Sequence, residues 1–296
     1  MDRLKGAFYG LSRTLESVLP LDLLWWLLLP LSALLAARHL RPSRVDLPVR
    51  SLPRRESDPK PSEQASWRHL TEFQTHWWLL GWLDRLGQPR WQRRIEWQGV
   101  EHLHRALIDR PVIVVTLHTT SVVALAALIR SLGITTAAAP ADQSWFRSSS
   151  RLRKVALAEE LGATVFRRGA SREIIDYLRP GRAIVLPVDH VQARSIDVAC
   201  GEATVTVGTG PFRLARATGS ALVPVLITSS GPWRYRIDVL PPAPQAHVES
   251  GSVAGSASYV VAQLLPLAAR EPDQAMQTLV DAVIQTRSVV SETRSG

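Results

Sequence analysis

The hydrophobic and polar positions divide the chain into two unlike parts. Residues 23–37 form an uncharged, mostly apolar run that only Pro30 and Ser32 interrupt. From Ile95 onward, short apolar runs of the strand type alternate with helical patterns. Alternation at this spacing predicts an α/β fold with a mostly parallel central sheet flanked by helices.

The expected strands are short and rich in β-branched residues: residues 95–98, 111–117, 134–138, 164–166, 183–188, 222–227 and 235–240. The expected helices lie between them, at residues 100–108, 121–132, 152–161, 171–178 and 210–218. Residues 111–117 (PVIVVTL) form the most continuous run, as expected for a strand buried on both faces. Two further segments look helical, residues 67–86 and the final amphipathic stretch 273–287.

We expect three parts along the chain: a membrane-anchoring helical segment at 1–40, a Pro/Arg-rich linker at 41–66, and an α/β domain at 67–296. The apolar run is short against the roughly 20 residues that a helix needs to span a bilayer. Basic residues flank it on both sides, so the positive-inside rule assigns no orientation. A span, a helix lying in the interface and a re-entrant segment kinked at Pro30 stay open. A cleaved signal peptide is disfavoured, because no clear A-x-A site follows.

Eight of the ten tryptophans precede residue 98. Tryptophan favours the membrane–water interface, because its ring is apolar and its N–H needs a partner. The N-terminal third therefore indicates contact with a membrane. For residues 67–86, packing on the globular domain is the alternative interpretation.

The formal net charge of +9 favours an anionic partner, such as a membrane surface, an acidic carrier protein, a phosphorylated substrate or nucleic acid. Binding to nucleic acid predicts aromatic residues interleaved with a basic stripe. Here the aromatic residues gather in the apolar N-terminal part instead, so we expect no nucleic-acid partner. A single cysteine, Cys200, excludes a disulfide framework and a Cys-based metal site, and we expect no metal.

His118 is the main candidate for catalysis. In open α/β sheets, ligands bind beyond the carboxyl ends of the strands. His118 directly follows the strand expected at 111–117, and Thr119, Thr120 and Ser121 follow it as possible helix caps. A histidine there suits a general base that acts on a hydroxyl during acyl transfer, although a structural histidine is the alternative. The chain has no G-x-S-x-G elbow, P-loop or H-E-x-x-H, so hydrolase, NTPase and zincin interpretations have no support.

Four segments in order carry a family resemblance: IEWQGVEHLHRAL, PVIVVTLHTTSVVALAALIRSLG, RGASREIIDYLRPGRAIVLPVDH and GTGPFRLARATGSALVPVLI. Together they resemble the Kdo2-lipid A lauroyl/myristoyl acyltransferases within the wider lysophospholipid acyltransferase superfamily. The likeness covers about residues 95–240.

The resemblance implies a membrane-associated enzyme that moves a fatty acyl chain from the thioester of acyl-carrier protein or coenzyme A to a hydroxyl or amine of a lipid-like acceptor. His118 would be the general base, and the thioester would be a co-substrate, with no cofactor. The resemblance also implies membrane lipid as a partner and a place at the bacterial inner membrane, with the catalytic domain facing the cytoplasm. The oligomeric state is not indicated.

The chain departs from the family pattern at Val123, five residues after His118, where the family carries Asp or Glu. Such an acid holds the catalytic imidazole in one tautomer and stabilises its protonated form. Asp142 and Asp189 are the best-placed substitutes, because both are expected in loops at the sheet edge. A catalytically inactive member that binds lipid or acyl carrier in a membrane complex is the alternative. A carboxylate within about 3.2 Å of a His118 ring nitrogen would favour the enzyme.

The remaining candidates are predicted to bind substrate, and they are basic, polar or small residues: Ser121, Arg147, Arg167, Arg168, His190, Gly208 and Thr209. The arginines could grip a phosphate or the acidic groups of a carrier. Gly208 and Thr209 precede a helix and could offer N–H groups to an anion, with ordinary turn chemistry as the alternative. The acyl chain is expected in an apolar channel along the helix at 122–132.

Overall fold

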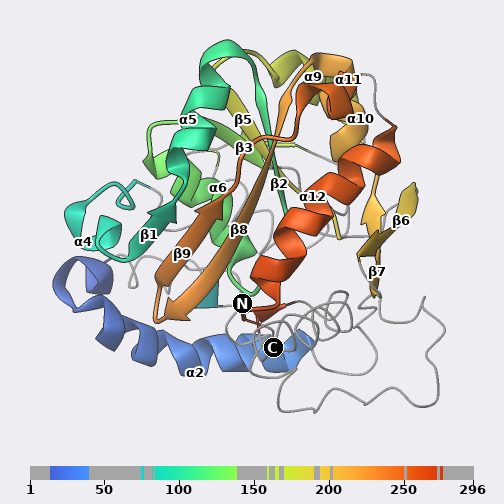
Figure 1. Ribbon diagram of the computed structural model, residues 1–296. Coiled ribbons are helices and arrows are strands. Elements are labelled where there is room, and N and C mark those ends of the chain that lie inside the picture. Colours follow the sequence, from blue (N-terminus) through green and yellow to red (C-terminus); the bar gives the residue numbers. More distant parts are fainter. Residues whose placement is uncertain are drawn as a thin grey trace, which may run out of the picture.

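The computed structural model describes residues 14–39, 75–76, 82, 84–138, 159, 164–166, 170–189, 194–200, 203–249, 252–271 and 274–275. These residues build a twisted central sheet with helices on both faces (Figure 1). The sheet has seven strands in the order β1-β9-β8-β2-β5-β3-β4, and β6 pairs with β7 in a separate hairpin.

The strands have these bounds: β1 Ile95–Gln98, β2 Val112–Thr116, β3 Thr135–Ala138, β4 Thr164–Val165, β5 Arg182–Pro187, β6 Ser195–Cys200, β7 Ala203–Gly208, β8 Ala221–Gly231 and β9 Arg234–Val239. Within the seven-stranded sheet, β8 and β9 are the only antiparallel neighbours, and all other neighbours run parallel. The prediction of a mostly parallel sheet flanked by helices is confirmed.

The helices have these bounds: α2 Leu21–His39, α4 Pro89–Gln92, α5 Val100–Asp109, α6 Val122–Ser131, α9 Ser171–Tyr177, α10 Gly210–Thr218, α11 Gln245–Glu249 and α12 Val253–Ala268. They cover the sheet from two sides, with α2, α4, α5 and α6 in one apolar core and α9 to α12 in the other. Strand β2 divides these cores, because Val112 and Val114 face the first while Ile113 and Val115 face the second. All five residues of β2 are buried, as its continuous apolar run predicts.

Gly99 explains one element of the sequence resemblance. It precedes α5 with a φ of 72°, a left-handed conformation that favours glycine. A Cβ at this position would overlap the carbonyl oxygen of Val239 at the end of β9. Glycine therefore lets the chain turn from β1 into α5 directly against β9.

Most expected strands and helices match the structure to within a few residues, but some elements were not expected and one predicted helix end is wrong. The β6–β7 hairpin and the long helix α12 were not expected. Helix α12 contains Gly255, Pro266 and two serines, which weaken a helical pattern, yet one of its faces is buried in the second core. The helix expected at 67–86 does not reach its predicted end, because residues 84–87 form turns. The segments expected at 152–161 and 273–287 lie almost wholly outside the described residues.

Helix α2 crosses the end of the molecule at which β2 and β8 terminate (Figure 1). Leu24, Trp25 and Leu28 are buried in the first core. The Trp25 ring lies edge-on to Trp233, in the turn between β8 and β9, with 5.1 Å between ring centroids. Among the described helices, none is long and apolar enough to cross a bilayer.

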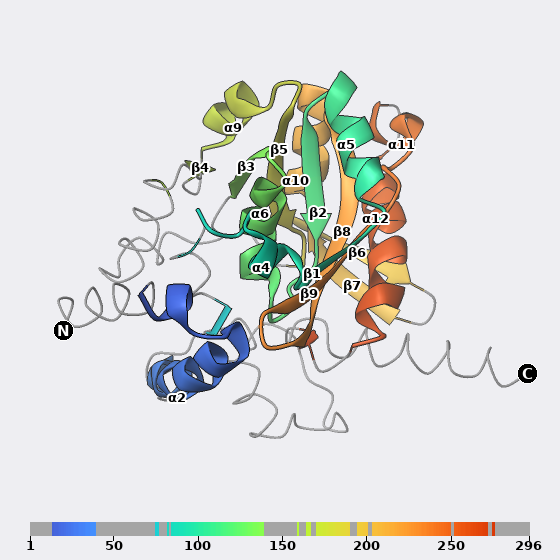
Figure 2. The same ribbon diagram turned by 90° about the vertical axis from the view of Figure 1, so that its left-hand side faces the viewer.

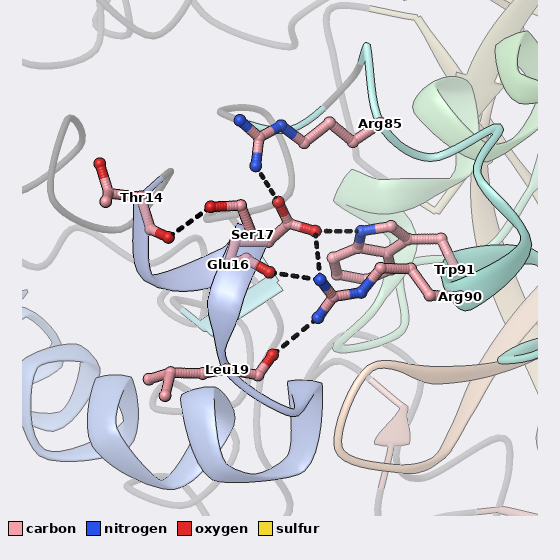
Figure 3. Close-up of polar contacts among 7 residues, drawn as sticks. All are labelled: Thr14, Glu16, Ser17, Leu19, Arg85, Arg90 and Trp91. Carbon is pink, nitrogen blue, oxygen red and sulfur yellow. Dashed lines mark hydrogen bonds and ion pairs between the residues drawn. The ribbon is translucent and has the colours of Figure 1, made fainter.

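A buried carboxylate joins the segment before α2 to the α/β domain (Figure 3). Glu16 is fully buried, forms an ion pair with Arg85, and accepts a hydrogen bond from Trp91 Nε1 at 2.9 Å. Arg90 donates to the carbonyl oxygens of Glu16 and Leu19, at 2.5 and 2.7 Å. The N-terminal helical segment is thus packed against the α/β domain rather than separated from it.

Candidate active site

The pairing of two parallel strands brings His118 and Asp189 together. In the register of β2 and β5, Thr116 lies opposite Pro187, and Val188 N–H then donates to the Thr116 carbonyl at 3.0 Å. Just beyond this pairing, where the two strands end, His118 Nδ1 lies 2.7 Å from Asp189 Oδ1. Two residues 71 positions apart in the sequence thus form a pair at the carboxyl edge of the sheet.

Asp189 holds both the backbone and the side chain of the histidine. Each of its carboxylate oxygens lies 3.0 Å from the backbone N–H of His118, in addition to the contact with the ring. The Asp189 side chain is fully buried, whereas 22 % of the His118 side chain is exposed. A carboxylate at Nδ1 favours the tautomer that carries its proton there, which leaves the basic lone pair on Nε2.

The electrostatics of the pair make the His118 imidazole more basic. Burial of the imidazole lowers the pKa of His118, but the negative charge of Asp189 and the hydrogen bond to it raise this pKa by more. The net result is a pKa above the ordinary value of 6.5. A proton taken up by His118 is therefore stabilised by Asp189.

Asp189 thus makes the contact with the His118 ring that the family resemblance leads us to expect from an acid at position 123. Val123 lies in the first turn of α6 and packs against the first core. Its side chain has no group that could orient an imidazole, and the carboxylate that contacts the ring comes from the end of β5 instead. The other acid considered, Asp142, lies outside the described residues, as do Arg147, Arg167, Arg168 and His190.

The turn after His118 is fixed by buried hydroxyls that do not cap the helix. Thr119 and Ser121 donate to the Ile227 carbonyl on β8, at 2.7 and 3.3 Å. Ser121 stands at the N-cap position of α6, but its side chain makes no capping hydrogen bond. The prediction that a hydroxyl of this turn caps the helix is therefore wrong for Ser121. Ser121 is fully buried, and its predicted contact with substrate stays a prediction. Thr120 Oγ1 is also buried and has no hydrogen-bond partner among the described residues.

Gln274, a residue that no sequence pattern marks, ties the turn to the end of β8. Its carbonyl oxygen accepts the N–H of Thr120 at 3.0 Å. Its side-chain amide accepts from Ser229 N–H at 2.6 Å and donates to the Ser229 carbonyl at 2.7 Å. The local sequence EPDQAMQ carries no motif that marks this glutamine. Only its burial against two distant segments shows its role.

Gly208 and Thr209 lie beside the pair, but their N–H groups already have acceptors. Gly208 donates to the Val188 carbonyl at 2.7 Å, and Thr209 donates to the Arg194 carbonyl at 3.1 Å. These bonds fasten the β6–β7 hairpin next to Asp189. The prediction that these two amides donate to a bound anion therefore needs correction, because both already donate to backbone carbonyls. Among the described residues, no group of three His, Cys, Asp or Glu side chains could hold a metal ion.

Comparison with known families agrees with this geometry. A family model described as bacterial lipid A biosynthesis acyltransferase matches residues 63–265, more than half of the chain. The chain belongs to this family. The resemblance seen in the sequence is thereby confirmed, and both His118 and Asp189 lie within the matched residues of this lipid A acyltransferase family member. A search among curated proteins returned no match.

Proposed function

We propose that this member of the lipid A acyltransferase family moves a fatty acyl chain from the thioester of acyl-carrier protein or coenzyme A to a hydroxyl or amine of a lipid-like acceptor. One observation carries the proposal, the 2.7 Å contact between His118 Nδ1 and Asp189 Oδ1. It supplies the oriented, stabilised base that direct acyl transfer requires.

In the proposed reaction, His118 Nε2 takes the proton of the acceptor hydroxyl as its oxygen attacks the thioester carbonyl carbon. The tetrahedral intermediate then collapses, the carbon–sulfur bond breaks, and the leaving thiolate receives the proton from the imidazolium. Asp189 stabilises the imidazolium between these two steps. Removal of the analogous aspartate in serine proteases costs about 10⁴ in rate. No covalent acyl-enzyme is needed.

Helix α6 contributes in two ways to this proposal. It begins at Val122, directly after the His118 turn, so the positive end of its dipole suits the negative charge that develops on the carbonyl oxygen. Val123 and Ala126 lie one turn apart, both partly buried and apolar. A valine in place of the family's acid extends this apolar face, along which we place the start of the acyl chain.

Membrane association belongs to the same proposal. On α2, four large apolar side chains are 48–62 % exposed: Leu23, Trp26, Leu27 and Leu34. Their spacing puts them on one side of the helix, opposite the side that packs on the domain. Such a helix suits a position in the plane of the membrane interface, with its apolar side among the lipids. Because α2 crosses the end where β2 terminates (Figure 1), this position would turn the His118 edge toward the membrane.

The rival hypothesis of an inactive, lipid-binding member rests on Val123. It predicts a His118 ring packed only by apolar groups, whereas Asp189 contacts Nδ1. The test offers acyl-carrier protein and coenzyme A, each loaded with a radiolabelled acyl chain, to detergent-purified protein together with extracted membrane lipids. It measures transfer of the labelled chain to lipid. We expect transfer that His118→Ala abolishes, whereas His104→Ala, an exposed histidine on α5, transfers normally. Equal transfer by wild type and His118→Ala would refute His118 as the base.

A further inference from the structure

A second, basic site lies on the flank of the fold. A cleft of about 670 Å³ opens beside the β6–β7 hairpin, α10 and the start of α12, and its lining includes Arg194, Thr209, Arg213, Arg216, Ile196 and Val253. Arg213 and Arg216 are one turn apart on α10, and Arg194 directly precedes β6. All three arginines are exposed.

The three guanidinium groups have no ion-pair partner among the residues that the structure describes, unlike Arg85, Arg94 and Arg236, which form ion pairs. Asp197 on β6 accepts a hydrogen bond from Thr206 at 2.6 Å and does not line the cleft, because side chains alternate along the strand and Ile196 faces the cleft instead. Like charges held close together repel one another and favour binding of an anion. Arginine suits phosphate in particular, because its planar fork donates two parallel hydrogen bonds.

The cleft is connected to the catalytic pair through a short path in the fold. Thr209 lines the cleft, and its neighbour Gly208 donates to the Val188 carbonyl at 2.7 Å. Val188 precedes Asp189, which contacts His118. With about 3.8 Å between sequential Cα atoms and about 5 Å for each hydrogen-bonded contact, this path from Thr209 to His118 is roughly 18 Å long. An extended phosphopantetheine arm has a comparable length.

The cleft and the lipid-facing helix lie on different sides of the protein. In Figure 2 the β6–β7 hairpin stands on the side opposite α2, and Figure 1 also separates the two. A lipid acceptor would approach from α2, whereas a water-soluble donor would approach from the solvent-exposed flank. The mixture of arginines with Ile196 and Val253 also suits a phosphate joined to a branched apolar group.

We propose that this arginine cleft binds the phosphate of the phosphopantetheine arm of the acyl donor, an inference that rests on the proposed acyl transfer. The arm is common to acyl-carrier protein and coenzyme A, and its phosphate lies at the end remote from the thioester. The cleft therefore anchors the donor while the thioester reaches His118. Ile196 and Val253 contact the dimethyl group next to the phosphate.

The test uses two unreactive thioether ligands, S-dodecyl phosphopantetheine and S-dodecyl pantetheine, which differ only in the phosphate. Calorimetry on the full chain in detergent measures their dissociation constants. For wild type, we expect the phosphorylated ligand to bind about 10- to 100-fold more tightly, as charge-assisted hydrogen bonds do. Arg213→Ala combined with Arg216→Ala should remove that preference and leave binding of S-dodecyl pantetheine unchanged. Arg172→Ala, an exposed arginine on α9 outside the cleft, is the matched control.

Several results would overturn the inference: no preference for the phosphate in wild type, an unchanged preference in the double variant, or equal weakening of both ligands. Glycerol 3-phosphate, a soluble substitute for a phosphorylated lipid headgroup, is a third ligand. If the double variant loses binding of glycerol 3-phosphate but keeps the preference for S-dodecyl phosphopantetheine, the cleft is assigned to the acceptor instead. Because thioethers cannot transfer their chain, these outcomes are independent of catalysis. Failure of the acyl-transfer assay would therefore leave a measured phosphate preference intact.

Discussion

The Asp189→Asn variant tests whether the acid from β5 replaces the one missing at Val123. The substitution keeps the shape of the side chain and removes its charge. The amide oxygen of the variant side chain would still accept the His118 backbone N–H, which Asp189 now accepts at 3.0 Å. The new NH₂ group, however, would donate to Nδ1 and force the ring proton onto Nε2, where the base must act. With the tautomer reversed, we expect kcat to fall by about 10³ to 10⁴.

The same variant should also shift the pH profile. In the wild type, Asp189 holds the pKa of His118 above 6.5 against the opposing effect of burial. Without the charge, burial remains, and the pKa falls below 6.5. Because the neutral ring is the base, the acid limb of the profile of kcat/KM should lie above pH 6.5 in the wild type and move to lower pH in the variant.

The assay is acyl transfer measured between pH 5 and 9, with the same donors and acceptors for all proteins. Asp176→Asn, an exposed aspartate on α9, is the control and should match the wild type in rate and in pH profile. A loss of less than tenfold in Asp189→Asn, or an acid limb that does not move, would refute the role assigned to Asp189. Circular dichroism of the variant excludes unfolding as the cause.

Four further predictions follow from other contacts. Trp26→Glu combined with Leu27→Glu should reduce binding to anionic vesicles in flotation by at least tenfold without lowering Tm, whereas Ile108→Glu, an exposed residue far from α2, should bind normally. Glu16→Gln breaks a buried ion pair and should lower the free energy of unfolding by about 2–3 kcal/mol in a denaturant titration; a change below about 0.5 kcal/mol would contradict this. Thr120→Val removes a buried hydroxyl without a described partner, so Tm should stay or rise, and an accompanying fall in kcat would show that substrate uses this hydroxyl. The raised pKa of His118 should make the wild type more stable than His118→Gln below pH 6.5, an advantage that disappears as pH rises through the folded-state pKa.

The strands of the sheet could be predicted because their signal is local. Residues 112–116 are five consecutive apolar or β-branched positions, and all five are buried. The β6–β7 hairpin and α12 were not predicted, each for its own reason. The hairpin lies in a segment whose glycine and threonine residues suggested a turn that binds anions. Helix α12 has serine, glycine and proline in its sequence, and only its packing on the sheet outweighs these weak helical propensities.

Only part of the candidate site could be predicted from the sequence. His118 could be named because it follows a recognisable strand and matches the family's ordered motifs. Asp189 was one of two aspartates expected at the sheet edge, and nothing in the residue types chose between it and Asp142. The register of β2 against β5 brings Asp189 to His118, because the two strands end side by side. Gln274 had no signal at all, since its partners are Ser229 and Thr120, far away in the chain.

Local patterns in this protein therefore specify the α/β class, the candidate histidine, the family and the apolar character of the N-terminal helix. Those features depend on neighbouring residues, whose periodicity and side-chain chemistry can be read along the chain. The tertiary structure alone decides which acid contacts His118, which side of α2 stays exposed, and that two arginines of α10 share one cleft with Arg194 beside β6. Each of these depends on strand pairing and packing between segments distant in sequence, where a shift in register of one residue would point the same side chains elsewhere.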